Sequence, residues 1–270
     1  MRQSLVATLL IVLAGGTAVA TMQNHPGDHA AANPALEAAV AAPTRTSTNR
    51  LRDPYRHPLE TLTFFGVKPG DTVVEMIPGG AWYSEILAPY LAASGKLYAA
   101  QPPGRAYDSL KARFGGESTF AKVSLVNLPA TGAEVPPGSV DVVLTFRNMH
   151  NLVMAGDGGE AGILANVYAM LKPGGTFGVV DHRLPESRDG TAERTSGYLK
   201  VSTVRRVVEA AGFEYVDASE INANPRDTAD YPKGVWTLPP TYREGDADRA
   251  RYQAIGESDR MTLKFRKPTA

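Results

Sequence analysis

The chain has 270 residues, of which 43% are hydrophobic and 21% charged, so it can bury a sizeable core. Its 28 basic and 28 acidic residues cancel, which argues against a protein that coats nucleic acid or an acidic membrane through bulk charge. It contains no cysteine, which excludes disulfides, thiolate metal ligands and a lipid-modified N-terminal cysteine.

The N-terminal residues have the pattern of a secretory signal peptide. Arg2 supplies a positive charge, residues 5–13 form an apolar core, and Ala18, Val19 and Ala20 form a small-x-small cleavage pattern. The apolar run is shorter than the roughly 20 residues that span a bilayer. We therefore expect cleavage after Ala20, a periplasmic or secreted protein, and no stable membrane insertion afterwards. An uncleaved N-terminal anchor is the alternative.

Residues 21–49 are rich in Ala, Pro, Thr and Asn and have little apolar periodicity. This composition is typical of a flexible linker. His25 and His29 lie four residues apart, but chance explains that spacing better than a metal site does in a segment interrupted by proline. We therefore divide the chain into a signal peptide (1–20), a flexible linker (21–49) and a single α/β domain (50–270).

Within the domain, short apolar strands alternate with helical stretches, which is typical of a parallel sheet covered by helices. In chain order, the pattern predicts a helix over 58–65, a strand over 72–76, a helix over 83–91, a strand over 96–100, a helix over 106–114, strands over 122–126 and 140–145, a helix over 161–171, a strand over 176–181, a helix over 201–211, and strands over 213–219 and 260–265. The strand over 140–145 is apolar enough to be central, and the last two strands should form a sheet edge.

The stretch VVEMIPGGAWY, residues 73–83, joins a buried strand to a helix through a turn rich in proline and glycine. Doubly wound α/β proteins hold nucleotide-like ligands at such a strand–turn–helix unit. We therefore expect a ligand at this turn. Trp82 and Tyr83 are interpreted first as core residues, with contacts to a lid or stacking on a cofactor as alternatives.

Three motifs, in this order and at these spacings, resemble the class I S-adenosylmethionine-dependent methyltransferase superfamily. They are VVEMIPGGAWYSEILAPYL, PPGSVDVVLTFRNMHN and LKPGGTFGVVDHR. DPYRHP at 53–58 and the terminal LKFRKP are similar to an exported bacterial group described as predicted methyltransferases. The resemblance covers about residues 50–268.

The resemblance implies a Rossmann-like, doubly wound fold with a seven-stranded, mostly parallel sheet and an antiparallel edge. It also implies an enzyme that uses S-adenosyl-L-methionine to methylate an unknown small-molecule or cell-envelope nucleophile. Nucleic acid is not an expected partner, because the chain carries no net positive charge.

Carried over to this chain, the family pattern places Glu75 at the end of the first strand, near the amino group of the cofactor. Gly79 and Gly80 would let backbone N–H groups approach the methionine carboxylate, helped by the positive end of the next helix. The alternative is that these glycines only make a tight turn. Pro78 stiffens the loop and narrows the path of the cofactor.

Other positions depart from the family pattern. Ile77 and Ala81 stand where many family members have glycine, and Gln101 stands where an acidic residue usually accepts both ribose hydroxyls. Asn127 matches a position near the adenine amino group, although a turn residue is an equal interpretation. Asn148, after the fourth strand, completes the predicted cofactor-binding set.

Polar side chains also follow the fourth and fifth predicted strands, where a doubly wound fold places its ligands. Arg147 suits an anionic substrate group, and His150 suits a proton acceptor for a hydroxyl or amine nucleophile. Asp181 is the alternative proton acceptor, and together with His182 it should face the first pair across a cleft. These four residues are the catalytic candidates.

Histidine and aspartate are also metal ligands, and His57 adds to the set formed by His150, Asp181 and His182. Their spacings match no standard zinc pattern, so no metal site is predicted. Residues 55–57 precede the first strand, where this fold often carries a substrate lid.

Two other classes of function compete with the enzyme hypothesis. A non-catalytic ligand-binding or envelope interaction protein with the same fold is favoured by Ile77, Ala81 and Gln101, and disfavoured by the clustered polar residues at the strand ends. A hydrolase or metal enzyme on the same sheet is disfavoured because the chain lacks a nucleophile elbow and a convincing set of metal ligands.

Overall fold

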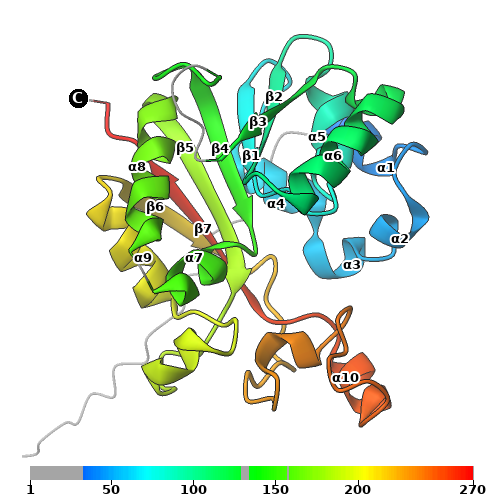
Figure 1. The fold of residues 1–270 in the computed structure, drawn as a ribbon, viewed down its shortest axis with the longest axis vertical. Coiled ribbons are helices and arrows are strands. Elements are labelled where there is room, and N and C mark those ends of the chain that lie inside the picture. Colours follow the sequence, from blue (N-terminus) through cyan, green and yellow to red (C-terminus); the bar gives the residue numbers. More distant parts are fainter. Residues whose placement is uncertain (1–32, 129–133, 157, 270) are drawn as a thin grey trace, which may run out of the picture. The chain divides into compact units, whose positions relative to one another are not determined.

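In the computed structural model, which describes residues 33–128, 134–156 and 158–269, seven strands form one sheet in the order β3-β2-β1-β4-β5-β7-β6 (Figure 1). The strands are β1 (Thr72–Met76), β2 (Lys96–Gln101), β3 (Val123–Asn127), β4 (Val140–Phe146), β5 (Leu171–His182), β6 (Glu214–Ser219) and β7 (Arg260–Arg266). β1 to β5 are mutually parallel, and β7 lies antiparallel between β5 and β6. This confirms the predicted class, a doubly wound α/β fold with an antiparallel edge.

Helices cover both faces of the sheet (Figure 1). They are α1 (Pro34–Ala41), α2 (Ser47–Arg50), α3 (Asp53–Arg56), α4 (Pro58–Phe65), α5 (Ser84–Leu91), α6 (Arg105–Gly116), α7 (Met149–Ala155), α8 (Gly159–Met170), α9 (Val201–Ala210) and α10 (Arg249–Ile255), with short 3-10 turns at Ser118–Phe120, Gly190–Arg194 and Gly234–Thr237. α1, α4, α5 and α6 share a core with one face, and α7, α8 and α9 share a core with the other.

The strand side chains alternate between these two cores with the period of two that a strand imposes. In β1, Val73 belongs to the core under α5, and Val74 belongs to the core under α8. Both faces of the strand are therefore buried, which explains why apolar residues stand next to each other in its sequence.

Most of the predicted elements are confirmed with shifted ends, and one boundary is wrong. The LKPGG run was expected to stop a helix and precede a strand at residue 176, but β5 already begins at Leu171. The chain can enter the sheet there because Gly174 adopts a left-handed φ of 78° and donates its N–H to the carbonyl of Lys267.

The prediction of a flexible linker is wrong for residues 33–49, which pack on the domain. Asn33 caps α1 by accepting from Leu36 N–H at 3.1 Å, and the Leu36 side chain is fully buried. Arg45 forms a two-pronged ion pair with Asp53, with both N–O distances at 2.7 Å. A single buried leucine in an alanine-rich helix produces too little periodicity to be recognised in sequence. Residues 1–32, with the predicted signal peptide, lie outside the described residues.

The long connection between β6 and β7, residues 220–259, extends beyond the edge of the sheet where the parallel strands end (Figure 1). It forms a small apolar cluster of its own with the segment that follows β5, and Tyr198, Leu238 and Leu184 are its most buried members. None of the helices in the described ranges has the length and apolar character needed to cross a membrane.

Candidate functional site

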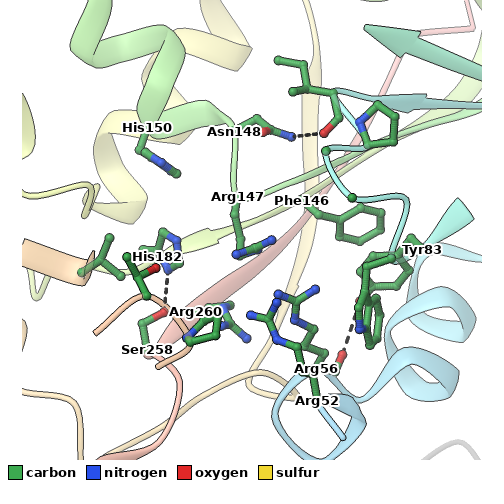
Figure 2. Close-up of a pocket in the computed structure, with 18 of the residues that line it drawn as sticks. Arg52, Arg56, Tyr83, Phe146, Arg147, Asn148, His150, His182, Ser258 and Arg260 are labelled. Carbon is green, nitrogen blue, oxygen red and sulfur yellow. Dashed lines mark hydrogen bonds between the residues drawn. The ribbon is translucent and has the colours of Figure 1, made fainter. Parts of the chain in front are cut away.

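A cavity of about 330 Å³ opens at the carboxyl ends of β1, β4 and β5. Its walls come from the loop after β1, the end of β4, the segment around α3, the start of β7 and the β6–β7 connection. This is the edge at which doubly wound folds bind ligands. The side chains in Figure 2 converge on it from all these segments.

The loop after β1 forms one wall and has an unusual backbone. Ile77, Gly79 and Ala81 all adopt left-handed φ angles, of 49°, 57° and 61°. A Cβ atom built on Gly79 or Gly80 would meet nothing within 4 Å, so the backbone there faces open space. Both glycines line the cavity, so the backbone of this loop is open to a ligand there.

Glu75, at the end of β1, lies at the bottom of this wall. Its carboxylate is 2% exposed and accepts a 2.5 Å hydrogen bond from the Ser84 hydroxyl. Burial raises the pKa of Glu75 to about 7, and the Ser84 bond only partly opposes that effect. A cationic ligand group beside Glu75 would favour its charged form.

The predicted ribose and adenine residues lie at the ends of β2 and β3 and do not line this cavity. Gln101 is buried, and its Oε1 has no hydrogen-bond partner among the described residues. A buried acceptor without a donor is costly, and a ligand hydroxyl would satisfy it. Asn127 is exposed, with its backbone N–H bound to Glu134. The open loop and the unpaired Gln101 oxygen fit S-adenosylmethionine.

Asn148 lines the cavity but also ties two walls together. Its amide nitrogen donates to the carbonyl of Ile77 at 3.3 Å, to that of Met76 at 3.1 Å and to Thr145 Oγ1 at 3.4 Å. Figure 2 shows one of these bonds to a carbonyl oxygen. They hold the loop after β1 against the end of β4, so Asn148 fixes the shape of that loop.

His150 begins α7 and is held by Asp181 at the end of β5. The carboxylate accepts from the backbone N–H of His150 at 2.9 Å and lies 2.8 Å from its Nδ1. This pairing assigns the proton to Nδ1 and leaves Nε2 as an acceptor with no hydrogen-bond partner among the described residues. Asp181 is fully buried and lies behind His150, so it positions the imidazole and does not reach the cavity.

His182 lies beside this pair, with its ring centroid 5.2 Å from that of His150. Its Nδ1 is 2.5 Å from Ser258 Oγ (Figure 2). Burial, and then the proximity of His150 and Arg260, hold the pKa of His182 well below its ordinary value, so the ring is neutral.

Three of the four residues considered as metal ligands come together, with ligand atoms of His150, Asp181 and His182 within 4.8 Å of one another. The Asp181 carboxylate already accepts three N–H groups, two from His150 and one from His182 N–H at 2.7 Å. His57 does not line the cavity; it occupies the left-handed turn between α3 and α4.

Four arginines line the cavity: Arg52, Arg56, Arg147 and Arg260. Sequence reasoning singled out two of them and missed Arg52 and Arg260. Arg260 was not predicted because the sequence pattern places ligand-binding residues at the carboxyl ends of parallel strands, and Arg260 begins a strand. β7 is antiparallel, so its first residue pairs with His182 and lies at the same edge.

Aromatic rings close the remaining wall. Tyr83 stacks on Phe146 with ring centroids 3.5 Å apart, and Trp82 packs beneath the guanidinium of Arg56 at 4.7 Å. Trp82 and Tyr83 are buried, which confirms their interpretation as core residues, and they also line the cavity. Trp236, from the β6–β7 connection, was missed in sequence; its ring lies 6.2 Å from that of His150. Of the predicted lid, residues 55–57, only Arg56 reaches the cavity.

Solved structures similar to this chain include proteins named as methyltransferases. A SAM-dependent methyltransferase from Aquifex aeolicus superposes with a TM-score of 0.55 at 15% identity, covering 80% of this chain and 92% of that one. A candidate sarcosine dimethylglycine methyltransferase from Galdieria sulphuraria gives 0.54 at 12% identity, covering 82% and 86%. The [4+2]-cyclase SpnF gives 0.54 at 15% identity, covering 88% and 92%.

The chain therefore has the class I methyltransferase fold. No family model matches its sequence, and no curated protein is significantly similar to it. At these identities the similarity establishes the fold alone. The structure named as a cyclase shows that proteins with this fold are not all named as methyltransferases.

The Glu75→Gln variant tests the buried carboxyl. The pKa of Glu75 is about 7 in the folded chain, against 4.5 in the unfolded chain. Between pH 4.5 and pH 7 the folded state therefore keeps a proton on Glu75 that the unfolded state has lost, and stability falls as pH rises through this window. Glu75→Gln should leave stability at pH 4.5 nearly unchanged and raise it by about 3 kcal/mol at pH 8. Urea unfolding at both pH values measures this, with the exposed Glu60→Gln as control. An equal effect at both pH values would contradict the assignment.

Proposed function

We propose that this chain is an exported S-adenosylmethionine-dependent methyltransferase acting on a small-molecule or cell-envelope nucleophile. The observation that carries the proposal is one cavity that combines an open backbone loop at Gly79 and Gly80 with an imidazole oriented by a buried carboxylate. The structural neighbours named methyltransferases support the same reaction class.

In the proposed mechanism, the Gly79–Gly80 backbone and Glu75 would hold the methionine end of the cofactor, and Gln101 would accept a hydrogen bond from its ribose. When bound, S-adenosylmethionine would supply an electrophilic methyl group, and its sulfur would be left as a neutral thioether. His150 accepts at Nε2 the proton that the acceptor hydroxyl or amine loses, and Asp181 stabilises the imidazolium that results. Most of the acceleration would come from holding the nucleophile in a reactive orientation.

Two rings lie near His150. The Trp236 ring lies 6.2 Å from it at an interplanar angle of 69°. Neutral His182 adds no positive charge that would oppose proton uptake by His150.

Binding of the cofactor is the direct test of this proposal. Calorimetric titration with S-adenosylmethionine and S-adenosylhomocysteine should give micromolar affinity. Gly79 has a left-handed φ, which Asp and Asn both tolerate comparatively well, so Gly79→Asp and Gly79→Asn form a matched pair. Gly79→Asp should weaken binding at least about tenfold more than Gly79→Asn, because it places a carboxylate against the methionine carboxylate. No heat at millimolar ligand would sink the enzyme hypothesis and favour a non-catalytic binding protein.

The role of His150 is testable without knowing the substrate. Long-range ¹H–¹⁵N spectra should show His150 protonated at Nδ1 and bare at Nε2. In Asp181→Asn, the amide can donate as well as accept, so we expect a mixture of tautomers. Ser258→Ala should change the spectrum of His182 and leave that of His150 unaltered. A bare Nδ1 in the wild-type protein would refute the proposed proton acceptor.

Export is supported by the charged, apolar and small-residue pattern of residues 1–20. When the full chain is expressed in a bacterium, the protein should be recovered from the periplasm or medium with Thr21 as its first residue, measured by intact mass. Recovery of uncleaved chain from the cytoplasm would contradict export and leave the methyltransferase proposal standing.

A further inference from the structure

The four arginines of the cavity come from three distant parts of the chain and line one place. Arg52 precedes α3 and Arg56 ends it, Arg147 follows β4, and Arg260 begins β7. Figure 2 shows their guanidinium groups directed toward a common centre below His150. Cations repel one another, so this arrangement needs a compensating charge.

The described part of the chain compensates only part of this charge. Glu257 is the ion-pair partner of three of the arginines, Arg52, Arg56 and Arg260. Arg147 has no ion pair and no side-chain hydrogen bond among the described residues. Four guanidinium groups and one carboxylate leave three positive charges at this wall.

Several of the guanidinium N–H groups are also buried without an acceptor. Nη2 of Arg52, Nη2 of Arg56 and Nε of Arg260 have no hydrogen-bond partner among the described residues. Arg56 is 4% and Arg260 2% exposed, so water does not reach these donors freely. Buried donors of this kind are normally paired, so these cations are poorly solvated, and an anion in the cavity that they line would stabilise them.

The surroundings of Arg147 disfavour its positive charge. Burial, and then the neighbouring charges of Arg260 and Arg52, lower the pKa of Arg147 to about 10. Burial and the charge of Arg147 likewise lower the pKa of Arg56. An anion bound in the cavity would offset the repulsion between these guanidinium groups and accept hydrogen bonds from them.

We propose that Arg52, Arg56, Arg147 and Arg260 form a subsite for an oxyanion of the methyl acceptor, which is therefore a small acid. This inference rests on the proposed function. A carboxylate or phosphate matches the guanidinium fork, which binds either group through two parallel N–H···O bonds. Arg147 and His150 line the same cavity, so an acid anchored at Arg147 lies in the cavity that also holds the proton acceptor.

The methionine carboxylate of the cofactor is the competing occupant, and the site geometry favours the acceptor. The loop at Gly79 and Gly80 has open backbone for that carboxylate. In Figure 2 the guanidinium groups of the four arginines lie between Phe146 and Tyr83 on one side and His182 and Ser258 on the other. The loop and the arginines are different parts of the wall of one cavity, which gives the cofactor anion and the acceptor anion a place each.

The test uses the mature chain and two probe anions, inorganic phosphate and succinate, titrated calorimetrically with and without saturating S-adenosylhomocysteine. One of the two should bind in both conditions, and the tighter one tells a phosphate acceptor from a carboxylate acceptor. Arg147→Gln should weaken the binding of that anion at least about tenfold and change the affinity for S-adenosylhomocysteine less than about twofold. Arg147→Lys should retain part of the affinity.

Arg105→Gln is the matched control, because it removes the same charge from an exposed arginine of α6 that has no side-chain hydrogen bond or ion pair among the described residues. Arg147→Gln breaks no such contact either, so its melting temperature should equal or exceed that of the wild type without anion. The inference fails if neither anion binds at about ten millimolar, if Arg147→Gln and Arg105→Gln behave alike, or if S-adenosylhomocysteine displaces the anion. Failure to bind S-adenosylhomocysteine while the anion still binds would overturn the proposed function instead.

Discussion

The carboxylate of Glu257 is the contact on which the rest of the site depends. It accepts from Arg52 Nε at 2.5 Å, from Arg56 Nε at 3.4 Å and from Arg260, joining segments more than 200 residues apart in sequence. Burial acts to raise its pKa, but Arg260, Arg56 and Arg52 together hold that pKa far below its usual range. The carboxylate is therefore charged at neutral pH, and it fixes α3 and its arginines against the start of β7.

This contact matters because of the direction of β7. An antiparallel strand begins at the edge where its parallel neighbours end, so Arg260 lies opposite His182 in the register. Glu257 then brings α3 to the same edge, and Trp82 packs under Arg56. The direction of β7 and the ion pairs of Glu257 together bring the arginines to the edge of the sheet where the catalytic candidates lie.

Local signals predicted the sheet, because apolar runs and glycine turns are properties of short segments. The same signals located Glu75, Gly79 and His150, which end strands or follow them directly. They could not locate Arg52 or Trp236, whose roles depend on contacts between segments far apart in the chain. The packing of residues 33–49 was missed for the same reason, since Leu36 is buried only by helices formed later in the sequence.

The loop after β1 shows how a departure from a sequence pattern can leave a shape intact. Left-handed φ angles at Ile77 and Ala81 cost on the order of 1–3 kcal/mol each. Asn148 bonds to the Ile77 carbonyl, and Ile77 N–H bonds to Ala100 at 2.7 Å, so neighbouring strands impose the conformation that glycine would adopt freely. Loss of glycine at these positions is therefore weak evidence for loss of the cofactor site, since the backbone geometry that the glycines serve is still present.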